Sequence, residues 1–129
     1  MHRLALALLC GSLAAATLSN GKLTAEFDER GLARVAGYRF TADNFAVTID
    51  GHVFDSATLP RASSKADPNR ILFTYRSTPY MFEVVYELRP DWHFISKQVI
   101  VSAPAGTKFR IDELQVFHSA IAEPIHDVY

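Results

Sequence analysis

Apolar and polar residues alternate with a period of two through most of the chain after residue 16. In the segment 22–28, Leu23, Ala25 and Phe27 fall on one face of an extended chain and polar residues on the other, which is the pattern of a strand with one buried face. The pattern returns in three further segments: 45–49, 71–75 and 80–88. Apolar residues show no sustained helical spacing there. These features predict an all-β fold, an antiparallel β-sandwich of about eight or nine strands.

Turn residues between these segments locate the connections. Asp50-Gly51 predicts a two-residue turn of type I′, in which both central residues need a positive φ. The segments on its two sides are therefore expected to form a hairpin. Residues 32–38 are expected to be a returning strand, interrupted by Gly37. Residues 56–69 are expected to be a loop that contains one short edge strand near 59–62.

Two later segments have features of their own. Residues 92–101 carry apolar side chains on both faces, which predicts a central strand or one covered on two sides. In residues 108–117 the alternation slips across Asp112 and Glu113. We therefore expect a β-bulge at these two residues.

The first sixteen residues have the three parts of an export signal: a basic start with Arg3, an apolar run over 4–9, and small residues at 14–16. The apolar run is too short for a bilayer span, which needs roughly 20 residues. We predict a signal peptide at 1–16, cleaved after Ala15 or Ala16, and one β-sandwich domain at 17–129. The protein is then secreted or periplasmic.

Cys10 raises the alternative of a lipidated cysteine. The peptidase that prepares such a site needs a small residue before the cysteine, and Leu9 stands there, so we disfavour a lipoprotein. Cys10 is the single cysteine of the chain, and its removal with the signal leaves no disulfide to stabilise the domain. The 13 basic and 14 acidic residues give a net charge of −1, which argues against a nucleic-acid partner.

Carboxylate pairs are the first candidates for chemistry, because glycoside hydrolysis needs two carboxyl groups about 5 to 10 Å apart. Glu83 and Glu87 are four residues apart on one strand face, about 13 Å by strand rise, which is too far. Glu26 and Asp28 share a face at about 7 Å, but alternating acidic residues usually form the solvated face of a strand.

Asp112 and Glu113 are sequence neighbours that point to opposite faces unless the bulge realigns them, so we predict no catalytic residue in these pairs. The histidines lack metal-ligand spacing, and we predict no metal site and no cofactor; they are His52, His93, His118 and His126. No Gly-x-Ser-x-Gly elbow and no Gly-rich phosphate loop occurs.

Aromatic residues are the remaining feature. Alternating aromatics usually fill a β-sandwich core, and we assign four of them to it: Phe73, Phe82, Tyr86 and Phe94. Trp92 differs because it follows the turn 89–91 and has Asp91 and His93 on either side. An exposed ring stacks on the apolar face of a sugar while polar neighbours bond its hydroxyls. We therefore name Trp92, Asp91 and His93 as candidate ligand-binding residues, with carbohydrate as the partner.

Two segments carry a resemblance to a known family. Ser19-Asn20-Gly21-Lys22-Leu23-Thr24-Ala25-Glu26-Phe27-Asp28-Glu29-Arg30-Gly31-Leu32, and more loosely residues 86–97 with 109–111, resemble the N-terminal β-supersandwich domains of large secreted glycoside hydrolases. Those domains have a galactose-mutarotase-like fold and precede a catalytic barrel, as in α-galactosidase-like enzymes. The resemblance implies that this chain is the first half of a supersandwich, a truncated or fragmentary product, and that the catalytic carboxylates belong to the later barrel.

The leading hypothesis is therefore a non-catalytic N-terminal β-sandwich portion of an exported carbohydrate-active protein. The alternative is a free-standing secreted binding or adhesion module, and a third is a small periplasmic enzyme that uses Asp112 or Glu113. A half-sandwich exposes edge strands and apolar faces, which predicts self-association or a missing downstream domain as partner.

Overall fold

The computed structural model describes residues 16–119, which form eleven strands. The strands are β1 (Ala16–Ser19), β2 (Thr24–Asp28), β3 (Gly31–Val35), β4 (Tyr38–Arg39), β5 (Asn44–Ile49), β6 (His52–Asp55), β7 (Arg61–Asp67), β8 (Arg70–Ser77), β9 (Tyr80–Glu87), β10 (Ser96–Ser102) and β11 (Ile111–His118). Residues 1–15 of the predicted signal peptide and the tail 120–129 lie outside the described residues. Within 16–119 there is no helix that could cross a membrane.

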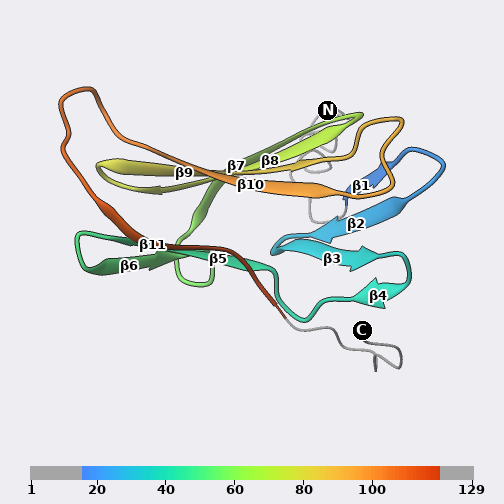
Figure 1. Cartoon of the computed structure of the whole chain (residues 1–129), viewed down its shortest axis with the longest axis horizontal. Coiled ribbons are helices and arrows are strands. Elements are labelled where there is room, and N and C mark those ends of the chain that lie inside the picture. The colour runs from blue at the N-terminus through green and yellow to red at the C-terminus, as the bar shows by residue number, and fades with distance from the viewer. Residues whose placement is uncertain (1–15, 120–129) are drawn as a thin grey trace, which may run out of the picture.

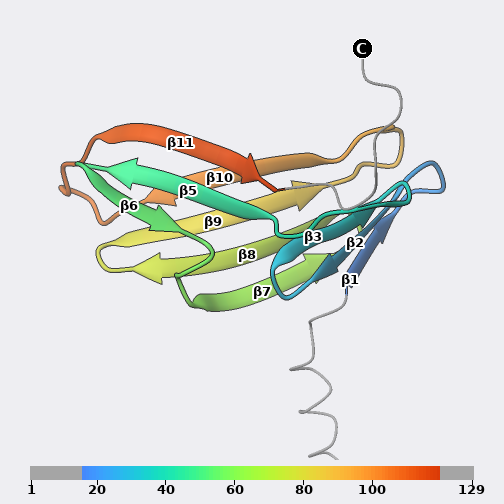
Figure 2. The ribbon, with the colours of Figure 1, turned by 90° about the horizontal axis from the view of Figure 1, so that it is seen from below.

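The strands form three antiparallel sheets, in the orders β1-β2-β3-β4, β10-β9-β8-β7 and β11-β5-β6. Figure 1 shows β7–β10 as one layer and β5, β6 and β11 as the layer that faces it. The sheet β1–β4 lies at the end of the molecule away from the β5–β6 turn (Figure 2). The predicted all-β, antiparallel sandwich is confirmed.

The core lies between the two layers and is rich in rings. Phe45 of β5 is fully buried and packs edge-on against Tyr75 of β8, with ring centroids 5.3 Å apart. Its ring is tilted by 34° relative to that of Phe82 of β9, at 5.7 Å. Phe73 and Tyr86 are also buried. β5, β8 and β9 therefore have their apolar faces inward, as the alternation predicts, and Phe73, Phe82 and Tyr86 are core residues.

The local turn and bulge predictions are confirmed. Asp50 and Gly51 have φ values of 48° and 83° and join β5 to β6, as a primed turn requires. The pairing of β11 with β5 shifts register between Ile111 and Glu113, which is the predicted bulge. Both features depend on residues adjacent in sequence, so local chemistry was enough to locate them.

Two strand predictions differ from the structure in extent. The strand expected at 32–38 is interrupted at Gly37 as predicted: β3 ends at Val35, because Ala36 and Gly37 have φ values of 51° and 87° and turn the chain into β4. Residues 56–69 contain an edge strand, as expected, but this strand, β7, has seven residues and lies later than 59–62; it is mostly exposed on both faces and therefore shows no alternation. With β1 and β4 added, residues 16–119 have eleven strands rather than the eight or nine expected.

The segment 92–101 is corrected most strongly. Its strand, β10, begins only at Ser96 and lies at the edge of its sheet rather than in the centre. One of its faces meets the core, but Ile100 on the other is 39% exposed. Phe94, predicted in the core, precedes the strand and is 54% exposed, because the face of this segment that carries Ile100 is not buried, as a strand covered on two sides would require.

Candidate functional site

A buried cluster of Asp43, Tyr86 and Lys97 joins three segments that are distant in sequence. Asp43 directly precedes β5, Tyr86 is on the inner face of β9, and Lys97 is the residue of β10 that pairs with Tyr86. Oδ1 of Asp43 accepts a hydrogen bond from Nζ of Lys97 at 2.7 Å. Oδ2 accepts from the backbone N–H of Leu32 at 2.9 Å and from the hydroxyl of Tyr86. The cluster therefore connects β3, β9 and β10 through one carboxylate.

Burial shifts the pKa values of Lys97 and Tyr86 in this cluster. The Asp43 side chain is fully buried and that of Lys97 is 11% exposed. Burial lowers the pKa of Lys97, and the Asp43 carboxylate opposes this shift. Burial, together with the charge of Asp43, raises the pKa of Tyr86 far above its usual value. Tyr86 is therefore a hydrogen-bond donor and not a base, and both oxygens of Asp43 are occupied, which is the arrangement of a structural clamp.

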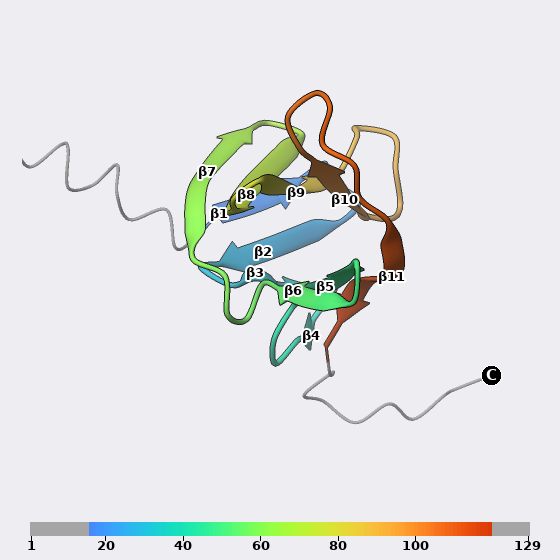
Figure 3. The same cartoon turned by 90° about the vertical axis from the view of Figure 1, so that its left-hand side faces the viewer.

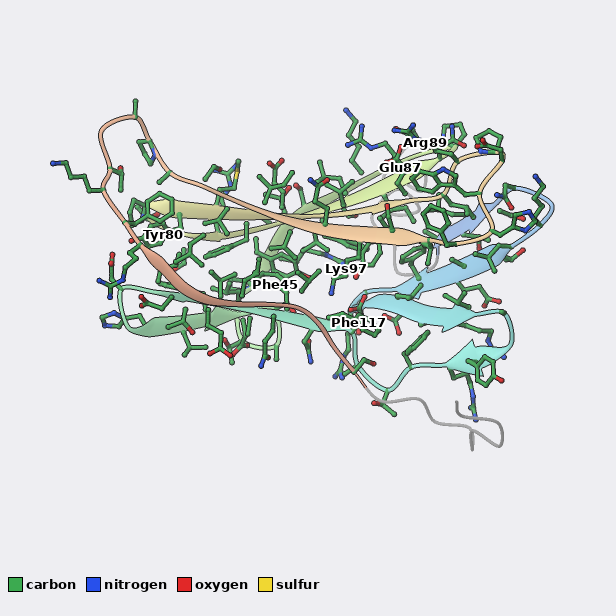
Figure 4. The ribbon with its side chains drawn as sticks, viewed as in Figure 1. Phe45, Tyr80, Glu87, Arg89, Lys97 and Phe117 are labelled. Carbon is green, nitrogen blue, oxygen red and sulfur yellow. The ribbon has the colours of Figure 1, made fainter. Side chains whose placement is uncertain are left out.

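An apolar cavity of about 250 Å³ lies beside this clamp. Its wall includes Phe40 and Phe117, whose rings meet edge-to-face with centroids 5.6 Å apart. Figure 4 shows Lys97 between the layers, close to Phe117, and its Nζ is 5.1 Å from the centroid of that ring. Since the ammonium is neutralised by Asp43, the cavity suits an uncharged, apolar group.

The predicted ligand residue Trp92 lies in the connection between β9 and β10. Its ring stacks on Phe94 with centroids 4.4 Å apart and an interplanar angle of 20°. The guanidinium carbon of Arg89 is 5.1 Å from the centroid of the Trp92 ring. Trp92 is partly buried, whereas Phe94 is 54% exposed. The accessible ring of this stack is therefore Phe94, and Trp92 supports it.

Asn20 holds the backbone under the stack. Its side-chain nitrogen donates to the carbonyl oxygens of Arg89 at 2.8 Å and Trp92 at 2.7 Å. Its side-chain oxygen accepts from the N–H groups of Lys22 and Leu23. The turn between β1 and β2 is thereby fixed to the turn that carries Trp92, and the aromatic stack stands on an ordered backbone.

Asp91 and His93 flank Trp92 and are exposed. The structure thus keeps the three sequence-predicted ligand residues on one connection and adds two more side chains, Arg89 and Phe94, to it. Sequence reasoning missed Phe94 as an exposed ring because alternating aromatic residues usually fill the core of a β-sandwich. Arg89 and Glu87, which form an ion pair at 2.9 Å, lie on the outer side of the upper layer (Figure 4).

Three of the four candidate acidic residues on strand faces contact a basic side chain or a backbone N–H. Glu26 lies 4.0 Å from Arg34 in an exposed pair, and Asp28 accepts from the N–H of Arg30 at 2.8 Å. Glu87 is paired with Arg89, as described above. Glu83, the other member of its predicted pair, points to the same outer side of β9 and is partly buried.

At the bulge, Asp112 accepts from Nε of Arg110 and from the N–H of Gly51 at 2.9 Å. These donors hold the pKa of Asp112 below its usual value, with Arg110 as the larger cause. Glu113 is exposed. Asp112 therefore ties β11 to the β5–β6 turn.

Histidines do not gather in the described residues. His52 and His93 are exposed, the side chain of His118 is not described, and His126 lies outside the described residues. Between residues 16 and 119, no group of three or more His, Cys, Asp or Glu side chains is placed to hold a metal ion. Comparisons with protein-family models, curated protein sequences and solved structures return no significant match.

Proposed function

We propose that this chain is a non-catalytic N-terminal β-sandwich portion of an exported, glycoside hydrolase-like protein, and that it contacts glycan through the Trp92–Phe94 stack. The observation that carries the proposal is the exposed Phe94 ring, backed by Trp92 at 4.4 Å. A flat ring on an ordered support matches the apolar face of a pyranose, and it loses little side-chain entropy on binding.

Polar side chains around the stack supply the second half of glycan recognition. Asp91 offers a hydrogen-bond acceptor, His93 offers a donor and an acceptor, and both are exposed beside the rings. Arg89 is oriented by Glu87 at 2.9 Å and lies over Trp92. Sugar hydroxyls that extend beyond the stacked ring find these groups within one connection of the fold.

The non-catalytic assignment is supported by the hydrogen bonds that Asp43 and Asp112 accept. Asp43 is buried with both oxygens bonded, and Asp112 is bonded to Arg110 and Gly51. Neither carboxylate is free to act as an acid or a nucleophile. Glycan contact without chemistry is the function that this set of side chains favours.

The test is titration with a panel of soluble oligosaccharides. Binding is monitored by tryptophan fluorescence, because Trp92 is the single tryptophan of the chain. For a sugar that binds, Phe94→Ala is expected to raise Kd about tenfold through the loss of one stacked ring. Tyr38→Ala is the matched control, since Tyr38 is another exposed ring, at 46%. No response to any sugar, or equal weakening by both variants, would reject glycan contact by the stack.

Export is proposed on the sequence pattern of residues 1–16 and has its own test. N-terminal sequencing of the protein recovered outside the cytoplasm is expected to begin at Ala16 or Thr17. The alternative, a free-standing secreted binding module, is separated by the genomic sequence after Tyr129. An in-frame barrel-coding region there supports the glycoside hydrolase-like parent, and a stop codon with cooperative folding of the chain supports the alternative.

A further inference from the structure

The edge strands of the described residues differ sharply in how they discourage pairing with other chains. β4 has two residues, and β1 and β6 have four each. β7 carries a register shift near Arg61 and the charged residues Lys65 and Asp67, and β11 has two register shifts. Short length, bulges and charge are the usual protections of a sheet edge. Five of these six edges are therefore protected.

The sixth edge, β10, has none of these protections. It runs for seven residues, Ser96–Ser102, and pairs with β9 without any register shift. Its single charge, Lys97, points inward to Asp43. The remainder is Gln98-Val99-Ile100-Val101 between two serines, an uncharged run with high β-propensity. Within residues 16–119 no strand pairs with its outer edge.

The apolar surface beside this edge is also incompletely covered. Val99 and Val101, on the inner face of β10, are only partly buried. β11 lies on the same side of the sandwich (Figure 3), and its Ile111 and Leu114 are 44% and 43% exposed although they pair with the buried Ile49 and Val47. An added strand at β10 would extend the sheet over this side and remove apolar surface from water.

We infer that β10 is a dimerisation edge, on which β10 of a second copy of this chain pairs antiparallel about a two-fold axis at Val99. In this register Gln98 lies opposite Ile100 of the second copy, Lys97 opposite Val101, and Ser96 opposite Ser102. No like charges face each other, and hydroxyl groups meet at both ends. The strand is thus complementary to itself, as an isologous interface requires.

A second copy fits this edge better than the other strand edges of the same protein do. Pairing of β10 with β7 of another copy would bring the charged residues Lys65 and Asp67 against a strand whose run 98–101 is uncharged, and would leave an open, repeating chain of molecules. Pairing with β11 would meet its two bulges. The symmetric β10 pair closes after two copies and forms one continuous eight-stranded sheet.

The test uses two double variants on the solvent face of β10 in the full chain. Gln98→Lys with Ile100→Lys places lysines opposite each other twice across the axis, and should raise the dimer dissociation constant at least about tenfold. Gln98→Lys with Ile100→Glu has the same positions but opposite charges across the axis, and should retain the dimer. Val53→Lys, on the β6 edge and 64% exposed, should leave the dimer unchanged.

Light scattering over a concentration series reads out the association, and thermal unfolding confirms that each variant is folded. If a double variant does not fold, Val99→Cys in a Cys10→Ser background gives a second readout: two thiols at the axis form an intermolecular disulfide, whereas Val53→Cys does not. A monomeric wild-type chain, a double-lysine variant as dimeric as wild type, or a lysine–glutamate variant that dissociates equally would overturn the inference. None of these results bears on glycan contact, which is measured separately.

Discussion

The ammonium nitrogen of Lys97 on β10 lies 2.7 Å from Oδ1 of Asp43, the residue that leads into β5. β10 and β5 belong to different layers, so this pair connects the two sheets across the core. Both charges are largely removed from water. Each therefore depends on the other, because a buried charge left without its partner is strongly unfavourable.

Removal of the carboxylate is expected to be costly. Asp43→Ala leaves Lys97 and Tyr86 without their acceptor and should lower the free energy of unfolding by about 3 kcal/mol, measured by urea denaturation. Glu26→Ala is the control, because the Glu26–Arg34 pair is exposed and its atoms are 4.0 Å apart; its effect should stay below about 1 kcal/mol. Equal losses for the two variants would contradict a structural role for Asp43.

The Tyr86 hydroxyl predicts a loss of stability at alkaline pH. The pKa of Tyr86 is raised above its usual 10.0 by burial and by Asp43, so the folded chain keeps a proton that the unfolded chain releases near pH 10. Stability is then fully present below pH 10 and falls above it. Tyr86→Phe should cost about 1 to 3 kcal/mol at pH 7 through the lost hydrogen bond, and should flatten the fall above pH 10.

Urea denaturation from pH 7 to pH 11 measures both effects. Lys97 acts with the opposite sign, because burial lowers its pKa from 10.5 and folding becomes more favourable as pH rises toward that value. The difference between wild type and Tyr86→Phe isolates the tyrosine. Tyr38→Phe is the control, since Tyr38 is exposed. If the free energy of unfolding of Tyr86→Phe falls with pH in parallel with that of wild type, the Tyr86 hydroxyl is not the source of the alkaline loss.

Gly31 is constrained by the same cluster. Its φ is +124°, and a Cβ there would lie 2.9 Å from Oδ2 of Asp43 and 3.0 Å from the Tyr86 hydroxyl. Gly31→Ala should therefore cost about 2 to 5 kcal/mol, from backbone strain and overpacking together. Gly21→Ala, with φ +84° and nothing within 4 Å of the added atom, should show only the backbone cost of about 1 to 2 kcal/mol. Thermal unfolding measures both variants. Equal losses for Gly31→Ala and Gly21→Ala would contradict a close approach of Asp43 and Tyr86 to Gly31.

Asp112 is expected to be structural at the bulge. Its pKa is lowered by Arg110 and Gly51, so its contribution to stability is present above its unfolded value of 3.8 and is lost as pH falls through the folded value. Asp112→Asn should lower the midpoint of thermal unfolding at pH 7, and the difference from wild type should shrink at acidic pH. Glu113→Gln should match wild type at both pH values. If the difference in midpoint between Asp112→Asn and wild type does not depend on pH, the ionised carboxylate of Asp112 does not stabilise the fold.

Features set by neighbouring residues were predictable. Alternation located β5, β8 and β9 and oriented Phe73, Phe82 and Tyr86 inward, because a strand with one buried face has a period of two. The sequence indicated only a short edge strand near 59–62 where β7 runs over Arg61–Asp67, since both faces of β7 are mostly exposed and its backbone pairing with β8 carries no signature in side-chain polarity. Phe94 was predicted in the core because both faces of 92–101 carry apolar residues, and that pattern does not show whether both faces are covered.

The buried cluster was missed although one signal pointed to it. Lys97 shares a strand face with Val99 and Val101, and a lysine on an apolar face indicates a partner charge inside. The sequence does not say which carboxylate that is, since Asp43 is more than fifty residues away along the chain and meets Lys97 only after the sheets stack.

By itself the sequence determined the all-β class, the Asp50-Gly51 turn and the bulge at Asp112. Each follows from the side chains and backbone preferences of residues that lie close together in the chain. The tertiary structure alone decided that Asp43, Tyr86 and Lys97 meet, that Phe94 and not Trp92 presents the open ring, and that β10 is an unprotected edge. These depend on which strands pair and which layers face each other. Such contacts join residues far apart in the chain, and only packing brings them together.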